Sequence, residues 1–231
     1  WITDFQEIYH PEYFTFLQLF FRRFNIFFSV LSASKIILSS IDSQNDLRKI
    51  IKINKKKIFI HPFFFDNYPI KKILNFKIIK NKYKINKNFF FLPNQYWPHK
   101  NHLLVLKAIL YLKEKYNLSI SVVSSGYHYA KGSRTYFNKV MDYARDHGLN
   151  KNYTYVGVVN EKELYSLIYH SKAIINPSVF EGWNTSVMQA KSLFKENIIS
   201  NIRSHIEQKN NKSFIFRNNN HISLAKAILK V

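Results

Sequence analysis

A short loop between a β-like segment and a helical pattern carries the residues with the clearest chemistry. The stretch "NPSVFEGWNTSVMQAKS" occupies residues 176–192 and passes into a helical pattern near Thr185. A helix that begins there directs unpaired backbone N–H groups and a partial positive charge into the loop, where they stabilise a phosphate. Asn184, Thr185 and Ser186 are therefore candidates for anion contact.

Two other polar residues of this stretch fit different parts of a ligand. Glu181 stands just before the helix and carries the wrong charge for a phosphate, so its carboxylate is suited to accept hydrogen bonds from hydroxyl groups. Gln189 lies about one turn inside the helix and reaches another part of the same ligand. A ligand with phosphates in the middle and hydroxyls at both ends is a nucleotide sugar. The alternative is that Glu181 and Gly182 form a solvent-facing turn and that Gln189 is an ordinary helix-surface residue.

Alternating strand and helix patterns must position this loop. From residue 89 onward, short β-like runs alternate with segments of helical periodicity that end at turn residues. Strands are expected at 89–92, 118–123, 153–159, 172–176 and 197–200, and helices at 101–116, from Ser133 to Gly148, from Asn160, and at 185–194. Repeated β-α units imply an α/β fold with a parallel sheet covered by helices on both faces. Ligands of such sheets bind beyond the carboxyl ends of the strands.

The first part of the chain is less regular but similar in kind. A helix is expected around 12–31, a strand at 35–40, a helix from Asp42 or Ser43, and a strand at 57–63. The stretch 66–88 is rich in Lys and Asn and lacks clean periodicity, so we interpret it as a linker between two domains, with room for a short element of its own.

The composition bounds the class of protein. With 231 residues, 46% of them hydrophobic, the chain has ample material for a packed core. The absence of cysteine excludes disulfides and thiolate metal sites and favours a reducing compartment. The net charge of +21 comes mostly from Lys residues scattered among Asn, Ile and Phe, a pattern typical of an AT-rich genome rather than of a surface for nucleic acid. A basic module that associates with RNA or a membrane stays open as an alternative.

The most apolar region, residues 13–38, is interrupted by Arg22 and Arg23. No uninterrupted run reaches the ~20 residues that a spanning helix needs. A core helix of a globular domain is favoured over an aromatic, basic face that contacts a membrane. No targeting signal is readable at Trp1, and we expect a cytoplasmic protein, with a peripheral contact at the inner face of the membrane as a further alternative. The nine His residues lack metal-site spacing, so no metal is expected.

Several segments together resemble one family. The stretch "PSVFEGWNTSVMQAKSL" resembles the E-x7-E region of the retaining group 1 glycosyltransferases, which have the two-domain GT-B fold. Residues 91–109 resemble the opening strand, loop and helix of their donor domain, 164–178 the segment before the acidic motif, and 200–208 the strand and loop after it. At the front, "WITDFQEIYHPEYF" with "ASKIILSS" resembles the later half of their acceptor-side domain.

The resemblance implies a domain organisation. Residues 1–65 would be the C-terminal part of an acceptor-side Rossmann-like domain, 66–88 the linker, and 89–231 the Rossmann-like domain that binds the nucleotide-sugar donor. The first strand and glycine-rich loop of the family have no counterpart, so the N-terminal domain is expected to be incomplete and the chain a fragment.

The resemblance also implies roles for individual residues. Lys100 would contact the diphosphate, although His99 and His102 are alternatives, and Glu181 would contact the transferred sugar, with Gly182 beside it. Gln95 and Gly182 are also expected to be donor-binding positions. The second acid of the motif contacts the ribose, and Gln189 stands at its position.

Two further positions depart from the pattern of the family. Gln95 stands where many members have an Arg, and Glu7 stands on the acceptor side where we expect a His. Trp183 and Tyr96 are expected to be packing residues rather than platforms for a sugar.

The function implied is transfer of a sugar from a UDP- or GDP-linked donor to a glycan or lipid-linked acceptor with retention, in bacterial cell-surface polysaccharide biosynthesis. Lys100 and the helix N-terminus near Thr185 would neutralise the diphosphate, so neither a metal nor another cofactor is expected, and no nucleic acid partner is expected. The main alternative is a catalytically impaired remnant that still binds nucleotide sugars, because of Gln189 and Glu7.

Overall fold

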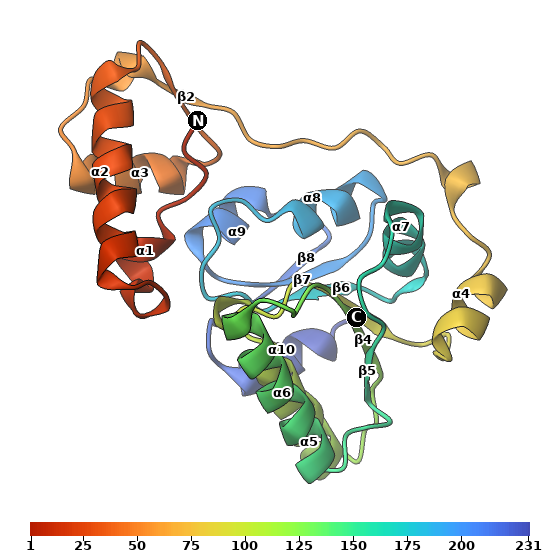
Figure 1. The fold of residues 1–231 in the computed structure, drawn as a ribbon. Coiled ribbons are helices and arrows are strands. Elements are labelled where there is room, and N and C mark those ends of the chain that lie inside the picture. Colours follow the sequence, from red (N-terminus) through yellow and green to blue (C-terminus); the bar gives the residue numbers. More distant parts are fainter. The chain divides into compact units, whose positions relative to one another are not determined.

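A computed structural model describes residues 1–231, without the side chain of Lys131. The chain forms two compact units (Figure 1). Unit 1 comprises Trp1–Phe64 together with Phe180–Thr185 and Ile202–Gln208. Unit 2 comprises Phe65–Val179, Ser186–Asn201 and Lys209–Val231.

Unit 2 contains a six-stranded parallel sheet. Its strands are β3 (Phe90–Pro93), β4 (Val122–Ser125), β5 (Tyr153–Tyr155), β6 (Ile174–Asn176), β7 (Asn197–Ser200) and β8 (Ser213–Phe216). Their order in the sheet is β5-β4-β3-β6-β7-β8, and every neighbouring pair is parallel. Counted from β3, this is the strand order of the Rossmann fold, which reverses direction between its first and fourth strands. The predicted α/β fold with a parallel sheet is confirmed, and its switch point lies between β3 and β6.

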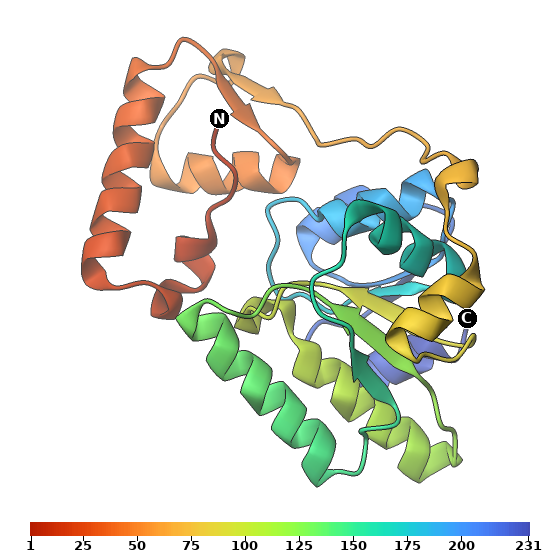
Figure 2. The ribbon, with the colours of Figure 1, turned by 45° about the vertical axis from the view of Figure 1, so that its right-hand side comes forward.

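Helices cover both faces of this sheet (Figure 2). They are α4 (Phe76–Tyr83), α5 (His102–Tyr116), α6 (Lys131–Asp146), α7 (Glu161–His170), α8 (Thr185–Ser192) and α10 (His221–Ile228). Phe90 and Leu92 of β3 belong to a buried cluster with α5, α6 and α10. Phe91, between them, belongs to a second buried cluster with α4, α7 and α8. Because successive side chains of a strand point to opposite faces, one short apolar strand supplies both cores.

Local sequence signals account for most element ends. Asn160 and Glu163 form the predicted capping box at the start of α7, with each side chain accepting from the backbone N–H of the other. Asn117 adopts a left-handed conformation and ends α5. The sequence misplaced the start of β4, expected at 118 and found at Val122, and of α6, which begins at Lys131 rather than Ser133.

The segment between the two predicted domains is not structureless. It contains a short 3-10 helix, Ile70–Lys72, and then α4. The backbone N–H of Leu74 donates to Ser166 Oγ on α7 at 2.9 Å, and Ile79 of α4 is fully buried. Residues 65–88 therefore fold as part of unit 2.

Unit 1 is smaller and also has parallel strands. Its elements are α1 (Gln6–Tyr9), α2 (Phe16–Ser32), β1 (Ile36–Leu38), α3 (Ile41–Ile50), β2 (Ile58–Ile60) and α9 (Arg203–Gln208). β1 and β2 pair in parallel over a core that includes Phe5, Leu38 and Leu47. Residues 203–208 form a helix where the sequence predicted a loop. The carboxylate of Glu207 on α9 accepts from the backbone N–H groups of Ile41 and Asp42 at 2.8 and 2.7 Å, which ties α9 to the start of α3.

α2 differs from the core helix that the sequence predicted. Only Ile26 and Val30 of this helix are buried, whereas Phe16 is 81% exposed. Thr15 caps its start, with its side chain accepting from the N–H of Gln18. Among the described residues, none of the helices has the length and apolar character that a membrane span requires.

Candidate functional site

The loops that follow β3 and β6 are held together at the switch point of unit 2. The side-chain amide of Asn94, directly after β3, donates to Asn176 Oδ1 at the end of β6 at 3.1 Å. Further along both loops, the backbone N–H of Val179 donates to the carbonyl of His99 at 2.8 Å. In a parallel α/β sheet, the crevice outside the switch point is the place where ligands bind. The structure therefore puts two loops of the predicted site side by side at that place.

The loop after β3 also depends on a glycine from the neighbouring strand. Gly126 follows β4 with φ of +146°, and a Cβ built there would lie 2.3 Å from the carbonyl oxygen of Asn94. Only glycine permits this approach. Tyr96 is fully buried, and its hydroxyl hydrogen-bonds to that of Tyr153 at 2.9 Å, so Tyr96 is the predicted packing residue.

Lys100 and Gln95 lie on this loop. Lys100 is half-buried at the end of a 3-10 turn, Pro98–Lys100, and its backbone N–H donates to Trp97 O at 2.9 Å. Gln95 is exposed and accepts from the indole N–H of Trp97 at 3.0 Å. The turn ends at Asn101, whose left-handed backbone directs the chain into α5.

His102 cannot serve as the charged alternative to Lys100. It is fully buried against the ring of Tyr96, and burial lowers the pKa of its imidazole from 6.5 to about 3. One ring nitrogen, Nε2, lies 3.2 Å from the carbonyl of Asn94 and donates to it. His102 is therefore neutral at pH 7 and supports the loop through its hydrogen bond to the Asn94 carbonyl.

α8 carries the next predicted residues, and its first turn is anchored to β3. Ser186 is buried, and its hydroxyl donates to the carbonyl of Pro93 at 3.0 Å. Thr185, the first residue of the helix, is exposed, and Gln189 is half-buried one turn further on. Because the Ser186 hydroxyl proton is engaged by Pro93, any anion contact from Ser186 would come from its backbone N–H.

Glu181 belongs to a buried hydrogen-bond network in unit 1. Its Oε1 lies 3.1 Å from the side-chain nitrogen of Asn184, which also lies 3.1 Å from His205 Nε2. Because a carboxylate only accepts, the amide of Asn184 must turn its NH2 group toward Glu181. The same NH2 group then donates to His205, which places the imidazole proton on Nδ1. All three side chains are at least nine-tenths buried.

A second residue of α9 holds the backbone of Asn184. The backbone N–H of Asn184 donates to Gln208 Oε1 at 3.0 Å, and Gln208 Nε2 donates back to the carbonyl of Asn184 at 2.8 Å. Sequence reasoning did not single out His205 or Gln208, because it treated their segment as a loop. The spacing of three residues between two polar side chains, which places them on one side of a helix, was the available signal.

Gly182 and Glu7, two other predicted residues, are also in unit 1. A Cβ at Gly182 would lie 2.7 Å from the carbonyl of Thr3, so a side chain there would collide with the backbone. Glu7 is 1% exposed, and its Oε2 accepts from Arg22 Nε at 3.0 Å. Arg22 also pairs with Asp4 at 3.1 Å. This ion-pair network joins α1 to α2 and compensates the buried charge of Glu7.

The predicted residues thus fall into two groups. Lys100, Gln95, Ser186 and Gln189 are in unit 2, and Glu181, Gly182, Asn184, Thr185 and Glu7 are in unit 1. Leaving aside the side chain of Lys131, no group of three or more His, Cys, Asp or Glu residues is arranged to hold a metal ion.

Comparisons with solved structures match the fold. Alr3699/HepE of Anabaena, in complex with UDP and glucose, has a TM-score of 0.79 at 15% identity, over 95% of this chain and 58% of that one. A glycosyltransferase from Rickettsia africae has a TM-score of 0.74 at 21% identity, over 85% and 52%. At these identities the similarity shows the fold alone, which is that of the GT-B enzymes.

Comparisons with curated sequences give similar relatives. The capsular polysaccharide biosynthesis glycosyltransferase CapH of Staphylococcus aureus is 28% identical over 177 residues, 70% of this chain and 47% of CapH. The O-antigen chain mannosyltransferase RfbU of Salmonella typhimurium is 23% identical over 201 residues, 87% of this chain and 51% of RfbU. The chain spans about half the length of both relatives.

The sequence profile of one family covers most of the chain, including every element of the six-stranded sheet and both loops at its switch point. It is described as "Glycosyl transferases group 1" and matches residues 75–231. The chain belongs to the group 1 glycosyltransferase family.

Proposed function

We propose that the protein carrying this chain transfers a hexose from a nucleotide-sugar donor to a glycan or lipid-linked acceptor, with retention of anomeric configuration. The observation that carries the proposal is the switch point between β3 and β6, because Lys100 follows the first of these strands and the Glu181 loop follows the second. CapH and RfbU act, by their names, in capsular polysaccharide biosynthesis and on O-antigen chains, which supports cell-surface polysaccharide biosynthesis as the setting.

The proposed chemistry is cleavage of the bond between the sugar and a nucleoside diphosphate. The bonding electrons leave with the phosphate, and the hydroxyl of the acceptor forms the new glycosidic bond as its proton is released. Lys100 and the N–H groups at the start of α8 stabilise the negative charge that develops on the departing phosphate. Glu181 accepts hydrogen bonds from the hydroxyls of the sugar and orients it, and Gln189 contacts the ribose. Since these protein groups neutralise the diphosphate, the proposed reaction uses no metal or other cofactor.

The donor is proposed to be UDP- or GDP-linked, and the protein to act in the cytoplasm. A solved neighbour, HepE, is described in complex with UDP and glucose, which favours the uridine nucleotide. Asn184 and Gly182 shape the loop that presents Glu181, and Gln95 lies at the exposed rim of the loop with Lys100. Glu7 is assigned to the acceptor-side domain, where its ion pair with Arg22 favours a role in holding α1 and α2 together.

Turnover of a nucleotide sugar by Glu181→Gln tests the proposal. The amide keeps the shape of the side chain but loses the charge that aligns the sugar hydroxyls. The expected result is a fall in kcat of about 100-fold, with the affinity for the nucleoside diphosphate nearly unchanged. Equal turnover by Glu181→Gln and the unmodified protein would contradict the role of Glu181.

A catalytically impaired nucleotide-sugar-binding protein is the second candidate, because Gln189 stands at the place of an acid. It predicts selective nucleotide binding without release of nucleoside diphosphate in the presence of acceptors.

A further inference from the structure

The long helix α2 of unit 1 is apolar on two sides, and one of them faces solvent. Its buried side is formed by Ile26 and Val30, which join the core around β1. The other side, which we name the α2 aromatic face, consists of Phe16, Phe20, Phe24, Phe27, Phe28 and Leu31, each at least 45% exposed. At about 100° per residue, this face extends from about 80° to about 200° around the helix axis from Ile26, so it adjoins the buried side and continues around to the opposite one.

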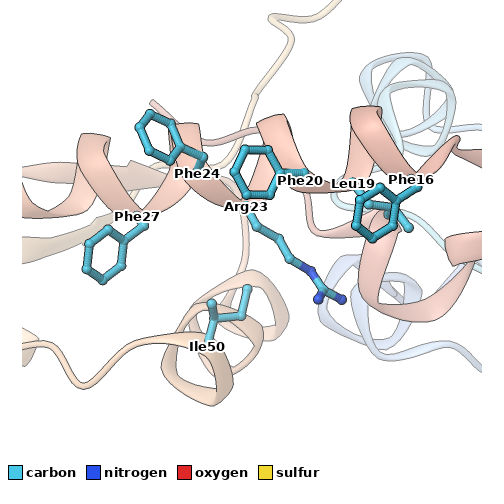
Figure 3. A pocket seen from close by; sticks show the side chains of 7 residues that line it. All are labelled: Phe16, Leu19, Phe20, Arg23, Phe24, Phe27 and Ile50. Atoms are coloured by element: carbon cyan, nitrogen blue, oxygen red, sulfur yellow. The ribbon is translucent and has the colours of Figure 1, made fainter.

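A groove runs beside this face. It has a volume of about 530 Å³ and is lined almost entirely by apolar atoms of α2 and by Ile50 of α3. Figure 3 shows the rings of Phe20, Phe24 and Phe27 projecting from α2, with Ile50 across from them and Arg23 extending from the same helix. Leu17 and Phe21, 65% and 57% exposed, extend the apolar surface beside this face, and beyond them the exposed residues Gln18, Asn25 and Ser29 are polar. The apolar surface is therefore a bounded strip rather than a uniformly apolar helix.

So much exposed aromatic surface in one place is unusual for a protein that is free in solution. Single exposed apolar residues are common, but contiguous patches mark surfaces that meet a partner or a membrane. Neighbouring rings here contact one another, as Phe24 and Phe28 do with centroids 4.3 Å apart. The patch is continuous along the helix.

Most of the exposed charges next to the strip are basic. Arg23 is exposed on α2, and Arg48 and Lys52 are exposed on either side of Ile50. Of the acids of the same region, Glu7 is buried against Arg22 and Asp46 is buried against Lys49, whereas Glu12, just before α2, is exposed and pairs with His10. A strip of aromatic residues flanked by Arg and Lys complements a surface that is apolar inside and negative outside.

We propose that the α2 aromatic face is a docking surface for an anionic phospholipid membrane. α2 would lie in the plane of the lipid headgroups, with its phenylalanine rings among the upper acyl chains and Arg23, Arg48 and Lys52 against the phosphates. This mode requires no spanning segment. It goes beyond the proposed transfer reaction and does not depend on it, and it predicts that the protein meets its acceptor at a lipid surface.

The absence of cysteine from the 231 residues makes a direct test available. Phe24→Cys, labelled with an environment-sensitive fluorophore, is mixed with vesicles of phosphatidylglycerol and phosphatidylcholine, or of phosphatidylcholine alone. Phe194→Cys is the matched control, because Phe194 is a phenylalanine of unit 2 with 66% exposure. The expected result is a blue shift for the label at position 24 with the anionic vesicles only, and none at position 194.

Sedimentation with the same vesicles measures the strength of binding. Phe20→Ser with Phe24→Ser should weaken binding to anionic vesicles by ~10-fold or more, because buried apolar area sets the strength of interfacial binding. The single change Phe194→Ser should leave it unaltered. Both positions are exposed, and a circular dichroism spectrum confirms that the variants fold.

Three results would overturn the proposal. One is equal binding of the unmodified protein and the double variant to the vesicles. Another is a label at position 24 that is shielded from solvent even in the absence of vesicles, which would mean that another part of the protein covers the strip. The third is a doubled mass in analytical ultracentrifugation that the double variant abolishes, which would assign the strip to a second copy of the chain.

Discussion

The side-chain amide of Asn184 donates to the carboxylate of Glu181 at 3.1 Å, within a network that continues to His205. The acid that is proposed to bind the sugar is thus itself held in place by a hydrogen bond from Asn184. A carboxylate that accepts such a bond keeps its orientation, so that its remaining acceptor positions are directed by the fold rather than by the ligand. The network makes Asn184 a positioning residue for Glu181.

Replacing Asn184 should lower turnover more than it lowers nucleotide binding. Asn184→Ala removes the donor to Glu181, and we expect kcat to fall by about 10-fold to 100-fold while the affinity for the nucleoside diphosphate changes little. Steady-state kinetics with titration calorimetry give the two quantities. Asn45→Ala, at an exposed asparagine of unit 1, is the control. A parallel loss of nucleotide affinity and melting temperature would mean that Asn184 is only structural.

Gln189 offers a gain-of-function test. Gln189→Glu adds a carboxylate that can accept from both ribose hydroxyls, where the amide has one acceptor oxygen. The gain is expected to be ~1–2 kcal/mol, or about tenfold in affinity for the nucleoside diphosphate. Calorimetric titration of this variant beside Gln189→Ala checks the prediction. If the variants with Glu and Ala bind equally, then residue 189 does not contact the ribose.

The buried imidazole of His102 predicts a dependence of stability on pH. Burial lowers its pKa from 6.5 to about 3 in the folded protein. Between these values the unfolded chain binds a proton that the folded one does not, so stability falls as pH decreases from about 6.5 toward 3. The contribution is about 1–2 kcal/mol between pH 6.5 and pH 5.

The matched variant for this pH effect is His102→Gln, which keeps a donor for the Asn94 carbonyl but does not titrate. Denaturant unfolding at pH 7, 6 and 5 should show a steeper loss of stability for the unmodified protein than for His102→Gln. The same slope in both proteins would place the cause in other groups.

Gly126 supports the site from the neighbouring strand. Gly126→Ala places a methyl group against the carbonyl of Asn94 and forces a backbone conformation that residues with a side chain rarely adopt. We expect a loss of about 3 kcal/mol or more in unfolding free energy. Gly148→Ala is the control, because Gly148 also has a positive φ, +62°, but open space around it, so it should cost only about 1 kcal/mol. Thermal unfolding of both variants separates the cost of the contact with the Asn94 carbonyl from the cost of a positive φ.

The sequence alone predicts the framework of unit 2 well. Its strands are short apolar runs bounded by turn residues, and its helices have caps such as Asn160 with Glu163, so local signals agree with the final fold. Errors occur where tertiary contacts decide. The segment 203–208 is short and polar. Its helix is stabilised by the hydrogen bonds that Glu207 accepts from backbone N–H groups of α3, and no local pattern reveals these bonds.

The candidate site could be predicted only in part, for the same reason. Glu181 stands out because it lies in a loop after a strand, just before a helix start, whereas Lys100 is assigned only through the resemblance to the family. The spacing of His205 and Gln208 indicates one side of a helix, but their hydrogen bonds to Asn184 span 21 to 24 residues and follow only from the placement of α9. The exposure of the α2 aromatic face could likewise not be predicted from the sequence, because an apolar helix of this composition is indistinguishable from a core helix until its neighbours are known.

The most direct test of the central claim is calorimetric titration of the chain with UDP, GDP and ADP, repeated for Lys100→Ala and for Lys107→Ala. Lys107 is an exposed lysine of α5 and controls for the general loss of one positive charge. A nucleotide site at the switch point predicts binding that selects one base, falls by about tenfold in Lys100→Ala and is unaltered in Lys107→Ala. Equal binding of all three nucleotides, or equal affinity of the two variants, would contradict a donor site at the ends of β3 and β6.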